Sequence, residues 1–150
     1  EMTSSLVGSE MCIRDRGNAD PNALQVAVAA AQAVERIGMP EARIILSQAA
    51  LYVATAPKSN ACYMAIDKAL DVVKNSKTAP VPVHLQDAHY KGSAKLGHGV
   101  GYLYAHDYPN HYVRQQYLPD AYVNEKFYEP GDMGYERDIK KHLDKIKSEA

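Results

Sequence analysis

The chain has 150 residues, of which 46% are apolar and 23% are charged, and this composition is typical of one compact domain and excludes a disordered acidic or basic tail. A formal net charge of −1 argues against a protein held to DNA or to a membrane by bulk electrostatics, and no apolar run approaches the roughly 20 residues of a membrane-spanning helix. The two cysteines, Cys12 and Cys62, form no CxxC motif, so a disulfide scaffold is excluded and a reducing compartment is expected.

Residues 1–16 show no helical periodicity, no turn signal and no capping residue. The stretch from Ser5 to Arg16 resembles a translated sequencing-adaptor read-through, so we predict that residues 1–16 are a non-native leader and exclude them from the fold prediction. A signal peptide is the alternative, but Leu6 and Val7 do not provide the apolar core that it needs. The predicted domain therefore comprises residues 17–150.

The first predicted helix runs from Pro21 to Ile37. Asp20 can accept hydrogen bonds from the free N–H groups of the first turn, and a proline is tolerated there because its missing donor would have no partner. Gly38 is expected to end the helix in a left-handed conformation. Apolar residues recur every three or four positions, as in a buried stripe, at Leu24, Ala27, Val28, Ala31 and Val34.

Two more helices are predicted, one over residues 40–56 and one from about Ser59 to a gradual end at residues 75–78. Pro57 ends the former. The predicted buried stripes consist of Ile45, Ala49, Tyr52, Val53 and Ala56 in one helix, and of Cys62, Ile66, Ala69, Leu70 and Val73 in the other. Because only a few residues connect consecutive helices, the three helices are expected to be antiparallel neighbours, and their many alanines allow close approach.

Residues 79–131 are a different kind of sequence, rich in tyrosine, proline and glycine. Eight of the 11 tyrosines lie between residues 90 and 128, whereas the chain has one phenylalanine and no tryptophan. Residues 81–83 are expected to be extended, and the weak alternation of residues 101–104 is compatible with a short strand. We expect the segment to be ordered, because tyrosine rings supply apolar area for packing while their hydroxyls can satisfy backbone groups.

A final helix is predicted after residue 131. Asp132 is a suitable cap, and a stripe of apolar residues follows at Tyr135, Ile139, Leu143 and Ile146. Glu136 and Lys140 have the spacing and order of a favourable ion pair on the outer face of this helix. The terminal residues 145–150 are expected to fray.

Two segments partly resemble nucleotide-binding motifs but lack residues that those motifs require. Gly92 to Gly99 has the frame of a phosphate-binding loop, but His98 stands in place of the required lysine and Gly99 in place of the magnesium-binding hydroxyl. Residues 97–101 lack the glycine spacing of a dinucleotide-binding turn. We therefore interpret these glycines as turn residues.

The histidines are candidate ligands for zinc or iron in a metal-dependent enzyme centred on His84, His98 and His106. Their spacing is irregular and they have no cysteine partner, so hydrogen bonding within loops is the favoured interpretation. Ser93, His98 and Asp107 could form a hydrolytic triad, but no nucleophile elbow or oxyanion motif accompanies them. We accordingly assign no catalytic, cofactor-binding or metal-binding residue.

Nucleic-acid binding is a further hypothesis. Tyrosine and arginine can stack on exposed bases. Residues 80–130 carry four basic and five acidic side chains, however, and therefore no basic stripe. Packing or a subunit interface is the favoured role of the tyrosines. The candidate residues for contact with DNA or a partner protein are Lys91, Lys95, Tyr102, Tyr104 and Arg114.

Several short motifs together resemble one known family. They occur in the order Gly17-x-Ala-Asp-Pro21, Gly38-Met-Pro-Glu41, Ala56-Pro-Lys-Ser-Asn-Ala61, Pro80-Val-Pro-x-His-Leu85, Gly101-Tyr-x-Tyr-x-His-Asp-x-Pro109, Tyr117-Leu-Pro119 and Phe127-Tyr-Glu-Pro130. This combination closely resembles the C-terminal region of the replication-associated recombination protein A family (RarA/MgsA), AAA+ ATPases related to clamp loaders. The resemblance covers residues 17–150.

The resemblance implies an all-α, antiparallel, collar-like domain with a long irregular excursion and a final helix, truncated on its N-terminal side. It implies a non-catalytic role in assembling the ATPase into a homotetramer, with single-stranded DNA and replication-fork proteins as further expected partners and with no membrane partner. ATP and magnesium would be cofactors of a module that this chain lacks. The expected location is the cytoplasm, in association with the nucleoid.

Overall fold

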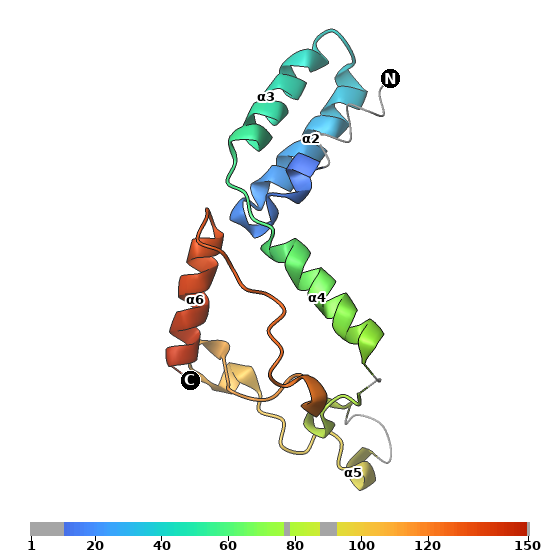
Figure 1. The fold of residues 1–150 in the computed structure, drawn as a ribbon, viewed down its shortest axis with the longest axis vertical. Helices are drawn as coiled ribbons and strands as arrows, with labels where there is room; N and C mark the ends of the chain where they lie inside the picture. The colour runs from blue at the N-terminus through green and yellow to red at the C-terminus, as the bar shows by residue number, and fades with distance from the viewer. Residues whose placement is uncertain (1–10, 77–78, 88–92, 150) are drawn as a thin grey trace. The chain divides into compact units, whose positions relative to one another are not determined.

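The computed structural model describes residues 11–76, 79–87 and 93–149, and every regular element in these ranges is helical (Figure 1). The prediction of an all-α fold is therefore confirmed, and the short strand considered at residues 101–104 does not form. The α-helices are α2 (Asn22–Ile37), α3 (Ala42–Thr55), α4 (Ala61–Asn75), α5 (Ser93–Leu96) and α6 (Glu136–Ser148). The 3-10 turns are η1 (Gly17–Ala19), η2 (Val83–Leu85), η3 (Ala105–Asp107), η4 (Pro109–His111) and η5 (Asp120–Tyr122). No helix in the described ranges is both long and apolar enough to span a lipid bilayer.

The chain divides into two compact units, whereas its length and composition predict a single compact domain. The first unit comprises residues 1–68 and 128–142, and the second comprises residues 69–127 and 143–150. The helical hairpin of α2 and α3 belongs to the first unit. Most of the tyrosine-rich excursion belongs to the second.

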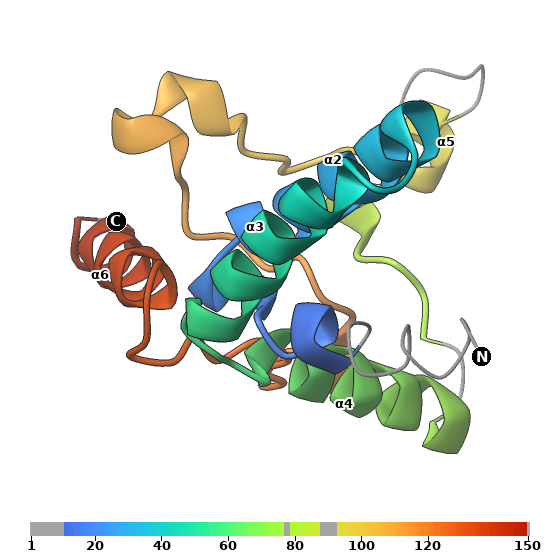
Figure 2. The same cartoon turned by 90° about the horizontal axis from the view of Figure 1, so that it is seen from above.

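The hairpin forms where local signals predict it. Asp20 Oδ1 accepts a hydrogen bond from the Asn22 backbone N–H at 3.0 Å, and this satisfies one of the free donors at the start of α2. Gly38 adopts a φ of +74° and donates its N–H to the Val34 carbonyl oxygen at 2.9 Å, which ends the helix. The chain then reverses over residues 38–41, and α3 packs beside α2 (Figures 1 and 2). The predicted ends of both helices agree with the observed ends to within two residues.

The start of α4 is also fixed by a side chain. Ser59 Oγ accepts a hydrogen bond from the Ala61 N–H at 3.1 Å, as a capping hydroxyl does, and α4 ends at Asn75. These limits agree with the predicted third helix.

The predicted buried stripes are only partly correct. On α2 the buried residues are Ala23 and Ala30, whereas Leu24 and Val28 are exposed. The prediction followed the larger side chains, but in an alanine-rich helix the neighbouring alanine stripe has the same periodicity and allows a closer approach. On α3 the predicted Val53 is buried.

The prediction that α4 has a buried apolar stripe is wrong. α4 contains no buried residue, and three members of the stripe, Ile66, Leu70 and Val73, are exposed. Periodicity shows that a helix has an apolar side, but it does not show which part of the protein, or of an assembly, covers that side.

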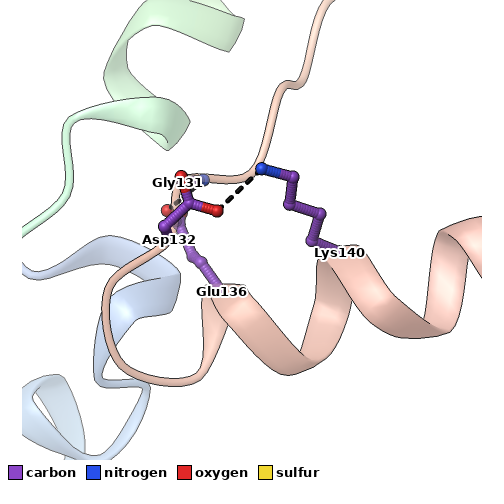
Figure 3. Close-up of polar contacts among 4 residues, drawn as sticks. All are labelled: Gly131, Asp132, Glu136 and Lys140. Carbon is purple, nitrogen blue, oxygen red and sulfur yellow. Dashed lines mark hydrogen bonds and ion pairs between the residues drawn. The ribbon is translucent and has the colours of Figure 1, made fainter.

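The interpretation of α6 needs two corrections (Figure 3). Asp132 lies four residues before the helix and accepts a hydrogen bond from Lys140 Nζ at 2.7 Å. Glu136 does not lie on the outer face, because its side chain is fully buried. One of its carboxylate oxygens accepts the Gly131 backbone N–H at 2.8 Å. The prediction of an ion pair between Glu136 and Lys140 considered only contacts within one helix, whereas Glu136 bonds to residues outside it.

In the second unit, glutamine amides satisfy part of the irregular backbone. Gln115 Nε2 donates to the Leu103 carbonyl oxygen at 2.9 Å, and Gln115 Oε1 accepts the Leu103 N–H at 3.2 Å. Gln86 Nε2 donates to the Val81 carbonyl oxygen at 2.7 Å. The Tyr117 hydroxyl accepts a hydrogen bond from the Gln115 side chain at 3.0 Å, and the expected bonds between tyrosine hydroxyls and the backbone stay a prediction.

Candidate functional site

The structure places four of the five predicted contact residues on the surface of the second unit. Lys95 lies in α5, Tyr102 and Tyr104 lie in the extended stretch before η3, and Arg114 follows η4. All four side chains are exposed. Lys91 lies outside the described residues.

Arg114 also lines a hollow of about 280 Å3 in the same unit. Two tyrosines form part of its wall, and the neighbouring Val113 is buried. The two tyrosines are Tyr108 and Tyr112, and the other residues that line the hollow with Arg114 are Pro109, Asn110, Val113, Ile146 and Glu149. The hollow thus combines two tyrosines and one arginine, which are side chains found at interface hot spots, with aliphatic surface and the carboxylate of Glu149.

A strained turn forms one edge of this hollow. Asn110 and His111 adopt φ values of +56° and +52°, a left-handed conformation that only asparagine and a few other non-glycine residues tolerate. Asn110 Nδ2 donates to Glu149 Oε2 at 2.6 Å, and this bond secures the turn. The ring of His106 lies 4.9 Å from that of His111 and 5.0 Å from that of Tyr104, measured between centroids.

The histidines take part in loop contacts. His84 Nε2 lies within hydrogen-bond distance, 2.8 Å, of the Gln116 carbonyl oxygen, which agrees with the favoured interpretation. In the part of the chain that the structure describes, no group of three or more His, Cys, Asp and Glu side chains could hold a metal ion. The structure does not describe the side chain of Ser93, so the hydrolytic triad stays untested.

Sequence reasoning missed a buried polar cluster in the first unit. Glu136 accepts hydrogen bonds from Ser59 Oγ at 2.6 Å, from the Tyr128 hydroxyl at 3.1 Å and from the Gly131 N–H. Asn18 Nδ2 donates to the Tyr128 hydroxyl at 3.1 Å. The cluster therefore joins three segments that are distant in sequence. No local motif indicates it, because Ser59 and Glu136 are 77 positions apart.

The electrostatics of this cluster favour a neutral tyrosine. Burial raises the pKa of Tyr128, and the nearby negative charge of Glu136 raises this pKa further, while the hydrogen bond from Asn18 lowers it. The hydroxyl thus keeps its proton and donates a hydrogen bond to the carboxylate. We interpret the cluster as a structural connection between the start of α6 and the loop before α4.

Comparison with known proteins identifies the family. The family model described as MgsA AAA+ ATPase C terminal matches residues 9–147. The chain belongs to this family. An AAA domain-containing protein of Mycobacterium tuberculosis is 50% identical over 134 residues, which cover 89% of this chain and 30% of that protein.

Two relatives carry a more specific name. The Replication-associated recombination protein A of Bacillus subtilis is 45% identical over 88% of this chain and 32% of its own length. The protein of the same name from Escherichia coli K12 is 41% identical over 86% of this chain and 29% of its own length. The chain thus spans about 30% of the length of these relatives, and the resemblance seen in its motifs is confirmed.

The match to the MgsA C-terminal family begins at residue 9, inside the predicted leader. In the structure Arg16 is buried and its Nε donates to the Val53 carbonyl oxygen at 2.8 Å, a contact that the exclusion of residues 1–16 did not anticipate. The Arg16 Nη1 group has no hydrogen-bond partner. The non-native origin of this segment stays a prediction.

Proposed function

We propose that this MgsA C-terminal domain joins copies of an AAA+ ATPase into a homotetramer and performs no reaction itself. We further propose that the whole protein acts in replication-fork maintenance and recombination, in the cytoplasm and in association with the nucleoid. Support for this role comes from the name of the B. subtilis and E. coli relatives, Replication-associated recombination protein A. ATP and magnesium are proposed to bind elsewhere in the ATPase, since this sequence contains no intact phosphate-binding loop.

The observation that carries the assembly role is the amount of apolar surface left uncovered. Among the described residues, six apolar side chains are buried, whereas 26 large apolar or tyrosine side chains are exposed. Val73 is 74% exposed and Leu51 is 65% exposed. Monomeric soluble proteins rarely expose extended apolar patches, and larger ones mark interaction sites. A chain with so small a core gains stability when this surface is buried against another subunit.

Light scattering coupled to size exclusion tests this proposal on the 150-residue chain. We expect a mass four times that of the 16.5 kDa chain, falling as the protein is diluted. The same samples should not hydrolyse ATP. A 16.5 kDa species at every concentration, or ATP turnover by this chain, would overturn the proposal.

A second candidate function is contact with single-stranded DNA. The specific observation is the exposed Arg114 at a hollow that two tyrosines line, since bases stack on tyrosine and phosphates pair with arginine. Lys95, Tyr102 and Tyr104 are exposed in the same unit. The near balance of acidic and basic residues makes this the second choice.

Fluorescence anisotropy with a labelled oligothymidine tests the DNA candidate. If it is correct, affinity falls as salt rises, and Arg114→Ala weakens binding about tenfold and reduces the salt dependence. Arg137→Ala, which removes an exposed arginine of the first unit, is the matched control and should leave affinity unchanged. If the affinity does not depend on salt and is unchanged in Arg114→Ala, this candidate function is wrong.

A further inference from the structure

The outer side of α2 carries an apolar stripe that is largely exposed, and its first residue, Leu24, also lines a hollow with Ile13 and Arg14 of the same unit. Leu24 and Val28 are 58% and 49% exposed, and Ala31 is exposed as well, at positions i, i+4 and i+7 of one helix. Successive residues of a helix are turned by about 100°. The stripe therefore lies roughly a third of a turn from Ala23 and Ala30, which are buried. α2 thus has two adjacent apolar sides, as a helix in a four-helix bundle does.

This helix is also depleted of charge. Residues 22–34 contain no Asp, Glu, Lys or Arg, and the charged residues of α2 are Glu35 and Arg36 in its last turn. A solvent-facing side of a helix ordinarily carries charged residues, whereas their depletion is typical of the centre of an interface. Across residues 11–58, which include Arg14 and Arg16 beside Leu24, five basic and four acidic residues nearly balance, so two copies carry little net charge that would repel them.

We propose that the stripe Leu24–Val28–Ala31 is a contact between two copies of this chain, with their α2 helices antiparallel about a twofold axis at Val28. This inference rests on the proposed role in assembly, and it specifies the surface that performs it. In such a pair Leu24 lies opposite Ala31 of the second copy, and Val28 lies opposite its own counterpart.

The order of side-chain sizes identifies a second copy as the occupant. The stripe runs from large through medium to small, and its antiparallel copy runs from small through medium to large. A large side chain opposite a small one allows two helices to interdigitate at close range. Because the surface is complementary to itself, it meets the requirement of a twofold interface, in which both copies use the same patch.

The decisive variant is Val28→Glu, because a twofold axis at this residue would place two carboxylates against each other. Like charges opposed in an interface are strongly unfavourable, so we expect the dissociation constant of the assembly to rise by at least about a hundredfold. The matched control is Val123→Glu in the second unit, because Val28 and Val123 are equally exposed at 49%. Sedimentation velocity over a range of concentrations measures assembly, and circular dichroism verifies the helical content of each variant.

A mixing experiment separates a twofold contact from simple loss of an apolar side chain. Val28→Lys should also prevent assembly alone, for the same reason. An equimolar mixture of Val28→Glu and Val28→Lys should assemble again, because each glutamate then faces a lysine. This rescue requires that residue 28 of one copy lies close to residue 28 of another.

The outcomes distinguish the inference from the function on which it depends. Loss of assembly in Val28→Glu, its retention in Val123→Glu and its rescue by mixing support the α2 contact. If Val28→Glu assembles as the unsubstituted chain does, or if mixing fails to restore assembly, the α2 contact is wrong while the assembly role stands. If the unsubstituted chain is monomeric throughout, both are overturned.

Discussion

Replacement of Glu136 tests whether the buried cluster holds the first unit together. Its carboxylate accepts three hydrogen bonds, from Ser59, Tyr128 and the Gly131 N–H, and its side chain is fully buried. Glu136→Ala removes the acceptor and leaves three donors in a partly buried site. Each unsatisfied buried donor costs about 1–3 kcal/mol. Because Ser59 and Tyr128 are not fully buried and retain access to water, we expect the low end of this range, a total of about 3–4 kcal/mol.

The conservative variant Glu136→Gln separates the charge from the hydrogen bonds. One carboxylate oxygen accepts from Ser59 and Gly131, so the amide oxygen of glutamine can take this place, while the amide nitrogen faces the Tyr128 hydroxyl. The bonds from Ser59 and Gly131 are then kept without the assistance of the charge, whereas the Tyr128 hydroxyl accepts from the amide nitrogen and no longer donates here. A charge-assisted bond exceeds a neutral one by about 1 kcal/mol, and we expect a loss of about 1–2 kcal/mol in total.

Urea unfolding followed by circular dichroism measures both variants. Protein concentration must be the same in each experiment, because assembly raises apparent stability. Lys141→Ala, an exposed substitution in the same helix, is the control and should change the free energy of unfolding by less than about 0.5 kcal/mol. If Glu136→Ala unfolds as easily as this control, the cluster contributes nothing to stability and our interpretation of it is wrong.

Three further predictions follow from single contacts. The pKa of Tyr128 is raised, so its contribution to stability is present below the ordinary tyrosine pKa of about 10 and is lost as pH rises through the higher folded value. In alkaline unfolding titrations, Tyr128→Phe should therefore reduce the decrease in the free energy of unfolding with pH. Gly134→Ala should lower the free energy of unfolding by at least about 3 kcal/mol, because a Cβ would collide with the Ala19 carbonyl oxygen. Gly38 has open space around it, so Gly38→Ala should cost only about 1 kcal/mol. Thermal unfolding of both variants measures the difference. Gln115→Ala should speed amide hydrogen exchange in residues 102–117 while leaving exchange in α2 and α3 unchanged, and equal acceleration in both would contradict the local role of this amide.

The parts of the fold that the sequence predicts correctly are those determined by neighbouring residues. Asp20 and Gly38 limit α2 through contacts with residues two to four positions away, and such contacts are visible in the sequence. The burial of Glu136 is not visible in the sequence, because its partner Ser59 lies 77 positions away. The periodicity predicts that Leu24 is in the core, and this is wrong because periodicity identifies an apolar side without showing what covers it.

The candidate site shows the same limit. The sequence predicts which side chains suit a contact, and the structure places Lys95, Tyr102, Tyr104 and Arg114 on the surface of one unit. The hollow beside Arg114 could not be predicted, because it also needs residues near the end of the chain, of which Ile146 and Glu149 are examples.

The contacts of the Gln115 side chain determine how the tyrosine-rich segment responds to salt. Its three hydrogen bonds, to both backbone groups of Leu103 and to the Tyr117 hydroxyl, join only uncharged partners. Bonds between uncharged groups are insensitive to screening by ions. This part of the tyrosine-rich segment should therefore keep its shape when buffer composition changes. A salt effect on ligand affinity there would report on the charges of the ligand and its cationic contacts, and not on melting of the loop that presents them.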